Sequence, residues 1–211
     1  MYLFGTVRTY LEDASSGKPT PGGGSVAALA GALGTSMACM AANFTVGKKK
    51  FEAVEPEVRG HLEACLRVRD ELLRLMDEDT LGYAKVSAAY SMPKESALEK
   101  ALRSEAIQSA LLAAMEPPLQ TVRLCRQMLQ EVAGLADIAN PNLISDVGVA
   151  ALLGEAALRA AKMNVEINLA ALKDAALAGR ARAEIEEAAR AGAAHARGVV
   201  EKVALAIGGS V

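Results

Sequence analysis

Apolar residues recur every three or four positions along most of the chain, the spacing that places them on one face of an α-helix. The chain therefore reads as a succession of helices with few loops. The expected helices run from Thr6 to Ala14, from Val26 to about Thr45, from Pro56 towards Ala89, from a cap at Ser96, from Leu119 to Val132, from Ser145 to about Leu177, and from Arg182 to about Ile207.

Residues that break or cap helices mark the expected boundaries. The longest cluster of such residues runs from Ser15 to Gly24, and Ser25 after it is a natural N-cap for the next helix. Ser96 and Glu99 have the spacing of a capping box. The pair Pro117-Pro118 is expected to end or kink the helix in which it lies.

No internal repeat and no linker between two domains is apparent. Gly179 is expected to separate the last two helices. The prediction is an all-α fold, a single domain over residues 1–211, with about seven or eight helices around a buried Ala/Gly-rich central helix.

Composition supports this prediction. Ala accounts for 43 of the 211 residues, aromatics for only 3%, and Trp is absent. Since Ala is the best helix former and strands need β-branched and aromatic residues, a β-sandwich or barrel is excluded. The apolar content of 52% excludes disorder. A net charge of −2 and the scarcity of aromatics argue against a nucleic-acid partner.

Cysteine and histidine usage points away from disulfides and metals. Cys39, Cys65 and Cys125 are far apart, which suggests reduced thiols in a cytoplasmic protein, and neither His61 nor His195 has a partner at zinc-ligand spacing. The start of the chain lacks the features of a signal peptide. The uncharged stretch 26–42 is short and Ala-rich for a membrane span, so a buried helix is expected instead.

The most informative stretch is Thr20 to Ser25, which contains three consecutive glycines before a helix. A glycine loop at a helix N-terminus presents free backbone N–H groups and the positive end of the helix dipole, so it can bind a carboxylate, a phosphate or a carbonyl oxygen. The alternative interpretation of the three glycines is a flexible turn between two helices. A dinucleotide fingerprint is rejected because no strand precedes the loop, and Gly47-Lys48 is not a P-loop because Lys49 follows.

The run from Pro19 to Lys50 resembles the signature of the formiminotetrahydrofolate cyclodeaminase / methenyltetrahydrofolate cyclohydrolase family. The resemblance extends from about residue 5 to about residue 175, and the matching segments follow one another in the order expected for the family. It continues through Asp77-Glu78-Asp79, Ala89 to Lys94, Ala106-Ile107-Gln108, Asn142, Ser145 to Ala151, and Asn164 to Leu169. Four positions depart from the family pattern: Tyr83, Ala84, Ser91 and Pro141.

The resemblance implies an all-helical homodimer that binds folate, with no metal or redox cofactor. The expected reaction is the cyclodeaminase reaction, which converts 5-formiminotetrahydrofolate to 5,10-methenyltetrahydrofolate and ammonia. One alternative is the cyclohydrolase reaction, which opens the methenyl ring to 10-formyltetrahydrofolate. Another is a non-catalytic folate-binding or scaffold subunit. Both reactions are proton-transfer problems on nearly the same skeleton.

Three residues are expected to be catalytic: Asp146, Asp79 and Lys48. Asp146 lies at the start of a helix, where the dipole favours a carboxylate, and is expected to act as the general base or to orient the attacking atom. Asp77 and Asp79 do not share a helix face, so only one or two members of the acidic triplet can face a pocket, and spacing does not decide which. The alternative interpretation of each of these residues is a solvated or helix-stabilising charge with no role in catalysis.

The expected substrate-binding residues fall into three kinds. The loop supplies backbone groups, and lysines suit the glutamate tail of folate, which often carries several glutamates. Polar or aromatic side chains suit the pterin, with Tyr90 as a further ring near Tyr83. They are Pro21, Gly22, Gly23, Gly24, Ser25, Lys49, Lys94, Tyr83, Asn142 and Ser145.

Overall fold

The computed structural model describes residues 1–208 of the chain, and within this range it forms six α-helices, three short 3-10 helices and no strand. The α-helices are α1 (Val7–Ala14), α2 (Gly23–Asn43), α3 (Glu55–Tyr90), α4 (Ala97–Ile138), α5 (Ile144–Ala171) and α6 (Ala175–Gly208). The 3-10 helices are η1 (Tyr2–Phe4), η2 (Lys49–Phe51) and η3 (Pro141–Leu143). The predicted all-α class is confirmed, with fewer helices than expected.

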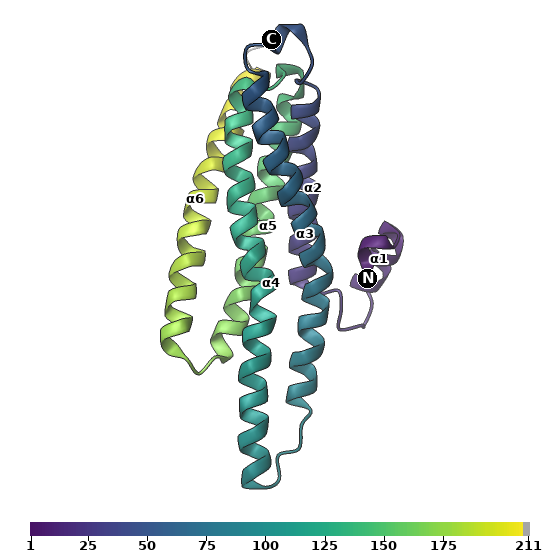
Figure 1. Ribbon diagram of the computed structural model, residues 1–211, viewed down its shortest axis with the longest axis vertical. Coiled ribbons are helices and arrows are strands. Elements are labelled where there is room, and N and C mark those ends of the chain that lie inside the picture. The colour runs from purple at the N-terminus through teal and green to yellow at the C-terminus, as the bar shows by residue number, and fades with distance from the viewer. Residues whose placement is uncertain (209–211) are drawn as a thin grey trace.

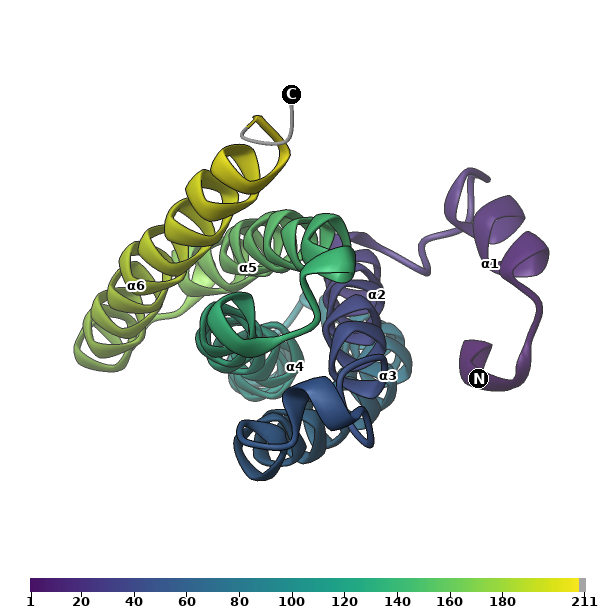
Figure 2. The ribbon, with the colours of Figure 1, turned by 90° about the horizontal axis from the view of Figure 1, so that it is seen from above.

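The five long helices, α2 to α6, lie side by side in an elongated bundle (Figures 1 and 2). Helix α2 packs against α3 and α5, whereas α4 packs against α3, α5 and α6. The hairpin of α3 and α4 extends beyond the other helices at the lower end in Figure 1. Helix α1 stands to one side, and its Tyr10 packs against Ala28, Leu75 and Met76.

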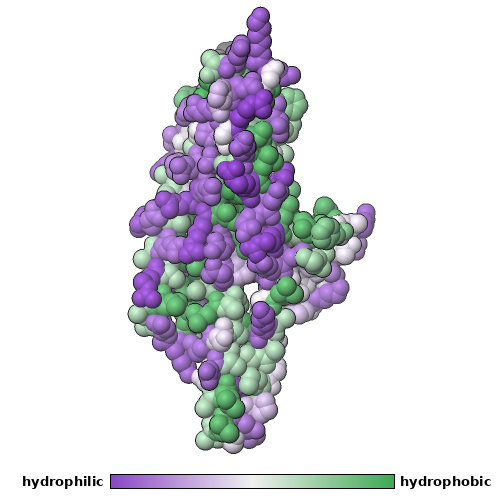
Figure 3. Space-filling model, in the orientation of Figure 1, coloured by the Kyte–Doolittle hydropathy of each residue, from purple (hydrophilic) through white to green (hydrophobic). Residues whose placement is uncertain are grey.

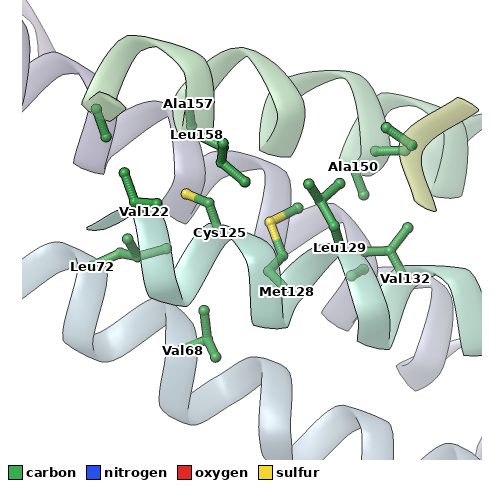
Figure 4. Close-up of a cluster of buried hydrophobic side chains, with 14 of the residues drawn as sticks. Val68, Leu72, Val122, Cys125, Met128, Leu129, Val132, Ala150, Ala157 and Leu158 are labelled. Carbon is green, nitrogen blue, oxygen red and sulfur yellow. The ribbon is translucent and has the colours of Figure 1, made fainter. Parts of the chain in front are cut away.

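The core lies along α4, between α3 and α5, and consists of fully buried aliphatic and sulfur-containing side chains (Figure 4). Helix α2 reaches this core through small residues. A Cβ atom at Gly31 would lie 2.9 Å from the sulfur of Cys125, and one at Gly34 would lie 3.0 Å from the terminal carbon of Met128. The glycines therefore allow α2 to approach its neighbours at backbone distance.

The expectation that Pro117-Pro118 ends or kinks a helix into two elements was wrong, because α4 continues through both as one helix of 42 residues. Both prolines are buried between neighbouring helices. Each removes only one N–H donor from the helix. Packing along the bundle outweighs the lost hydrogen bonds.

Two other expected boundaries were also wrong. The last break lies at residues 172–174 and not at Gly179, because the carboxylate of Asp174 accepts the backbone N–H of Leu177 at 2.9 Å and so starts α6 earlier. Helix α2 begins at Gly23, with Gly22 as N-cap, so Ser25 lies inside the first turn. The Ser25 hydroxyl is engaged with Tyr10 instead of capping the helix.

The sequence analysis expected α2 to be buried on all sides, and this expectation was wrong. Val26, Leu33 and Met40 are 45%, 54% and 37% exposed, and their spacing of seven residues places them on one stripe. Helix α5, which packs against α2, also carries exposed apolar side chains, and these together with the α2 stripe are here called the α2–α5 face: Val149, Leu152, Met163 and Ile167. Helix α2 is long and apolar enough to cross a membrane by length and composition, and 61% of its most apolar window is buried inside the fold.

In the view of Figure 3 the upper half of the bundle is mostly hydrophilic. Hydrophobic side chains gather instead on the lower half and on the N-terminal segment. The exposed apolar residues of these parts include Phe4 and Leu98, at 83% and 68%.

Candidate active site

A cavity of about 420 Å³ opens at the N-terminal end of α2. The glycine loop forms one side of it, and α3, α4 and α5 form the others. Among the residues that line it are Gly22, Gly23, Gly24, Asp79, Tyr83 and Asn164. The structure therefore brings the loop together with one of the predicted catalytic carboxylates and one of the predicted aromatic residues.

Asp79 reaches this cavity from α3 and is held by the first turn of α2. Its Oδ2 accepts the backbone N–H of Ser25 at 2.9 Å. A Cβ atom at Gly24 would lie 2.1 Å from Oδ1 of Asp79, so the carboxylate can occupy this position only beside a glycine. Burial raises the pKa of Asp79, and the hydrogen bond from Ser25 offsets part of that rise.

The glycine loop leaves donors open towards the cavity. Among the described residues, neither the Gly23 nor the Gly24 backbone N–H has an intramolecular acceptor. These groups belong to the first turn of a 21-residue helix, at the positive end of its dipole. They can therefore bind an oxygen atom that carries or develops negative charge.

Two asparagines of α5 face the loop from the opposite wall. Asn164 lies so close that a Cβ atom at Gly23 would be 3.2 Å from its amide. Its Nδ2 donates to the carbonyl oxygen of Ala160 at 2.9 Å, and Asn168 donates in the same way to Asn164 at 3.0 Å. Sequence analysis placed both in a family segment but not in the site. The available signal was two amides four residues apart, which places them on one face of α5.

The acidic triplet divides its roles between two sides of α3. Asp77 is buried and accepts the backbone N–H groups of Tyr2 and Leu3, at 2.6 and 3.3 Å. It therefore holds the N-terminal segment against α3, away from the cavity. Asp79, two residues later, is the member of the triplet that faces the cavity. Helical geometry explains the split, since residues two apart point in different directions.

Tyr10 supports the first turn of α2 from behind. Its hydroxyl is 2.9 Å from the Ser25 hydroxyl in a buried hydrogen bond. Since the Ser25 backbone N–H also holds Asp79, the N-terminal segment and the catalytic carboxylate candidate meet at one residue. Burial raises the pKa of Tyr10, which keeps its hydroxyl protonated.

The remaining predicted residues do not line this cavity within one chain. Helices α2 and α5 are antiparallel, because Asn164 lies beside Gly23 at one end, and the Asn140 backbone N–H donates to Thr45 at the other end, at 2.8 Å. Five of the predicted residues lie at that far end. Lys48 directly precedes η2 and Lys49 begins it, whereas Asn142 lies in η3 and Ser145 and Asp146 lie in the first turn of α5.

Of the other three predicted residues, two lie beside the cavity and one does not line it. Pro21 and Ser25 are buried beside the glycine loop. Lys94 is exposed in the turn between α3 and α4. Tyr90, like Tyr83, lines the cavity and is about half-exposed, so both rings are available to a flat ligand. Among residues 1–208, no group of three or more His, Cys, Asp or Glu side chains is placed to hold a metal ion.

Comparison with known proteins identifies relatives of this arrangement. The family model described as formiminotransferase-cyclodeaminase matches residues 6–187. A methenyltetrahydrofolate cyclohydrolase of Methylorubrum extorquens is 39% identical over 181 residues, which cover 86% of this chain and 87% of that protein. A formimidoyltransferase-cyclodeaminase of Rattus norvegicus is 30% identical over 172 residues, which cover 82% of this chain but only 32% of that protein.

A solved structure has the same fold over nearly the whole chain. The crystal structure of formiminotetrahydrofolate cyclodeaminase from Thermotoga maritima superposes with a TM-score of 0.78 at 33% sequence identity. The superposition covers 97% of this chain and 96% of that one. The similarity therefore extends over the glycine loop and all five helices of the bundle.

Proposed function

Because this chain belongs to the formiminotransferase-cyclodeaminase family, we propose that it is an enzyme that acts on one-carbon derivatives of tetrahydrofolate at the glycine-loop cavity. Relatives of two activities support this proposal, and both act at 5,10-methenyltetrahydrofolate, as substrate or as product. The observation that carries the proposal is the position of Asp79, held against the open N-terminus of α2 with Asn164 opposite.

Of the two reactions, sequence identity favours hydrolysis of 5,10-methenyltetrahydrofolate to 10-formyltetrahydrofolate. The cyclohydrolase relative is 39% identical, whereas the cyclodeaminase structure is 33% identical. The sequence analysis ranked the cyclodeaminase reaction first, and it is the second candidate here. It is supported by the likeness of fold over almost the full length of a stand-alone cyclodeaminase.

The hydrolysis needs one base and one group that stabilises developing negative charge. In the proposed mechanism the Asp79 carboxylate takes a proton from water while the water oxygen attacks the methenyl carbon. The raised pKa of Asp79 makes it a stronger base than an exposed aspartate. The N–H groups of Gly23 and Gly24 stabilise the oxygen of the tetrahedral intermediate. The hydroxyl of this intermediate then loses its remaining proton to solvent as the formyl carbonyl forms, the bond from the carbon to N5 breaks, and Asp79 returns to N5 the proton that it took from water.

The same groups suit the cyclodeaminase reaction. There N10 attacks the formimino carbon, and the bond from that carbon to the departing nitrogen breaks. Asp79 takes the proton of N10 and passes it to the departing ammonia, so one carboxyl serves as base and then as acid. Both reactions move only protons and carbon–heteroatom bonds, so the proposed chemistry requires no metal or redox cofactor.

Absorbance in the near ultraviolet distinguishes the candidates, because the methenyl form has a distinctive band there. Accelerated loss of the band from methenyltetrahydrofolate identifies the cyclohydrolase. Appearance of the band from formiminotetrahydrofolate, with release of ammonia, identifies the cyclodeaminase. Folate binding with neither change identifies a non-catalytic folate-binding subunit, and absence of folate binding contradicts the proposal.

We further propose that the protein is a homodimer joined through the α2–α5 face. The exposed apolar side chains Val26, Leu33 and Met40 repeat along the whole of α2, and Ile167 belongs both to this face and to the cavity wall. A contiguous apolar surface of this kind is typical of an interface. A twofold axis near Leu33 makes the face pair with itself, as cyclic dimers require.

Such a dimer gives a role to the residues at the far end of α2. Helix α2 has 21 residues and is about 30 Å long, so Asp146 and Lys48 lie far from the glycine loop of their own chain. The proposed twofold axis makes the α2 helices of the two subunits antiparallel, so the C-terminal end of one α2 lies beside the N-terminal end of the other. We propose that Asp146 and Lys48 act at the cavity of the partner subunit.

A further inference from the structure

The glycine-loop cavity occupies the space that a longer α2 would fill. Helix α2 begins at Gly23, which lies beside Asn164 of α5. Because the two helices are antiparallel, the later turns of α5 extend past the start of α2. Asn168, one turn after Asn164, therefore lines the cavity beyond the end of α2.

The side-chain amides of the two asparagines are oriented in the same way. In each, Nδ2 donates to the backbone carbonyl oxygen four residues earlier, that of Ala160 at 2.9 Å and that of Asn164 at 3.0 Å. Since a carbonyl oxygen only accepts hydrogen bonds, the NH2 group must be the part of the amide that faces it. The Oδ1 atom of each residue is therefore directed away from that carbonyl.

These two oxygens are free to accept. Within residues 1–208 neither Oδ1 accepts a hydrogen bond, and no buried side-chain oxygen or nitrogen lacks a partner, so both atoms are accessible. Asn164 and Asn168 both line the cavity and lie about 6 Å apart along the axis of α5. Their amides therefore offer a ligand two acceptors and no free donor group, whereas the glycine loop offers donors.

The fold gains little from these amides. The carbonyl oxygens that they contact belong to α5, where backbone N–H groups already bond to them in the helical pattern. Asn is also a poorer helix former than Ala, and Ala dominates the rest of this helix. The two asparagines are therefore better explained by what they present to the cavity.

From this arrangement we infer that Asn164 and Asn168 recognise the pterin ring of the substrate by accepting hydrogen bonds from its N–H groups. The inference rests on the proposed function and names the residues that determine its ring specificity. A tetrahydropterin carries donors at its 2-amino group and at N8, on one edge of the ring, and the reacting N5 lies on the other edge. Asp79 comes from α3 and the asparagines come from α5, so a ring that presents N5 to Asp79 presents its donor edge to α5.

Calorimetry with three ligands tests this inference. They are tetrahydrofolate, its 8-deaza analogue, in which CH2 replaces N8–H, and its 2-desamino-2-methyl analogue. The wild-type protein is expected to bind each analogue about tenfold more weakly than tetrahydrofolate, the effect of one hydrogen bond. The double variant Asn164→Ala with Asn168→Ala is expected to bind all three ligands with similar Kd, close to that of the wild-type protein for the analogues.

A second variant separates the bond to the helix from the acceptor in the cavity. In Asn168→Ser the hydroxyl can donate to the carbonyl oxygen of Asn164, as the amide does, but it is too short to accept from the ring. This variant is expected to lose preference for tetrahydrofolate over at least one analogue. It also replaces the double variant if that protein loses its helical circular dichroism.

The matched control removes a similar amide outside the cavity. The Nε2 of Gln120 donates to Glu116, one turn earlier on α4, at 2.7 Å, and Gln120 is not among the described residues that line the cavity. Gln120→Ala is expected to keep the wild-type preference for tetrahydrofolate over both analogues.

The outcomes separate this inference from the proposed function. Equal binding of the three ligands by the wild-type protein overturns the inference, and turnover of methenyltetrahydrofolate or formiminotetrahydrofolate then leaves the proposed function standing. Equal weakening of all three ligands in the double variant also overturns it, because the amides then shape the cavity without accepting from the ring. If the protein neither binds tetrahydrofolate nor turns over either substrate, the proposed function fails and the inference fails with it.

Discussion

The carboxylate of Asp79 accepts the backbone N–H of Ser25 at 2.9 Å, across the gap between α3 and the first turn of α2. This bond joins the acidic side chain of the cavity to the helix whose N-terminus supplies the open N–H groups. The pair has one steric condition, which is that Gly24 carries no side chain. The proposed base and the proposed oxygen-binding groups are therefore positioned by the same contact.

Gly24→Ala tests that condition directly. The new Cβ atom would lie 2.1 Å from Oδ1 of Asp79, so the carboxylate must move. Because a displacement of about 1 Å in a catalytic group can cost about a hundredfold in rate, kcat/KM is expected to fall by about that factor with helical circular dichroism retained. Gly179→Ala is the control, since nothing lies within 4 Å of its Cβ position in α6. It should keep full activity and gain about 1 kcal/mol in stability.

Asp79→Asn is expected to lower kcat/KM by about a hundredfold or more, the range for loss of a general base. The pKa of Asp79 is higher in the folded protein than in the unfolded chain. Stability therefore falls as pH rises through the window between the two values, and the charged carboxylate destabilises the fold above it. The variant should then have an equal or higher Tm at neutral pH. A lower Tm would mean that Asp79 is structural.

The pH dependence of the wild-type enzyme follows from the same shift. A base must be deprotonated, so kcat/KM is expected to rise with pH through a value above the ordinary pKa of aspartate. This acidic limb should disappear in the residual activity of Asp79→Asn. A limb that persists unchanged in the variant would assign the titration to another group.

Complementation tests whether each site uses two subunits. Asp79→Asn and Asp146→Asn are expected to be inactive separately. After joint refolding, half of the dimers are mixed and each has one intact site, so about a quarter of wild-type activity should return. Sites contained within one chain predict no recovery. Full activity of Asp146→Asn alone would remove that residue from the mechanism.

The oligomeric state is tested at the middle of α2. Leu33→Lys places a charge at the centre of the α2–α5 face, where the leucine is 54% exposed. Sedimentation is expected to show a dimer for the wild-type protein and a monomer for the variant. Leu98→Lys is the control, because Leu98 is 68% exposed at the start of α4, outside this face. A monomeric wild-type protein contradicts the proposed interface.

Tyr10→Phe removes the buried hydrogen bond to Ser25 and leaves the serine hydroxyl without that partner. Loss of such a bond costs about 1–3 kcal/mol, so thermal unfolding should shift downward. Activity is expected to fall less than in Asp79→Asn, because the Ser25 backbone N–H still holds the carboxylate. An unchanged Tm would show that the N-terminal segment does not support the loop.

The local sequence predicted features that depend on a few neighbouring residues. The capping box of Ser96 and Glu99 is present as expected, and α1 begins after Thr6 and ends at Ala14. The breaks expected at Pro117-Pro118 and Gly179 were wrong because packing along α4 and a cap at Asp174 decided those positions. A local breaker signal cannot report how well neighbouring helices compensate for it.

The site was predictable to a similar degree. The glycine loop, Asp79 and Tyr83 all line one cavity, as motif and residue chemistry suggested. Asn164 and Asn168 were missed as site residues, since only the antiparallel packing of α2 and α5 brings them to the loop.

The close approach of α2 to its neighbours limits how this enzyme can change in evolution. Gly24, Gly31 and Gly34 each face atoms that a single added carbon would strike at 2.1 to 3.0 Å, so the helix behind the glycine loop cannot acquire new side chains there without repacking the bundle. Variation in substrate must arise on the walls opposite, at positions such as Tyr83 and Asn168. The glycine loop and α2 are therefore expected to stay constant among relatives, whereas new substrate specificity is expected to arise on the facing helices.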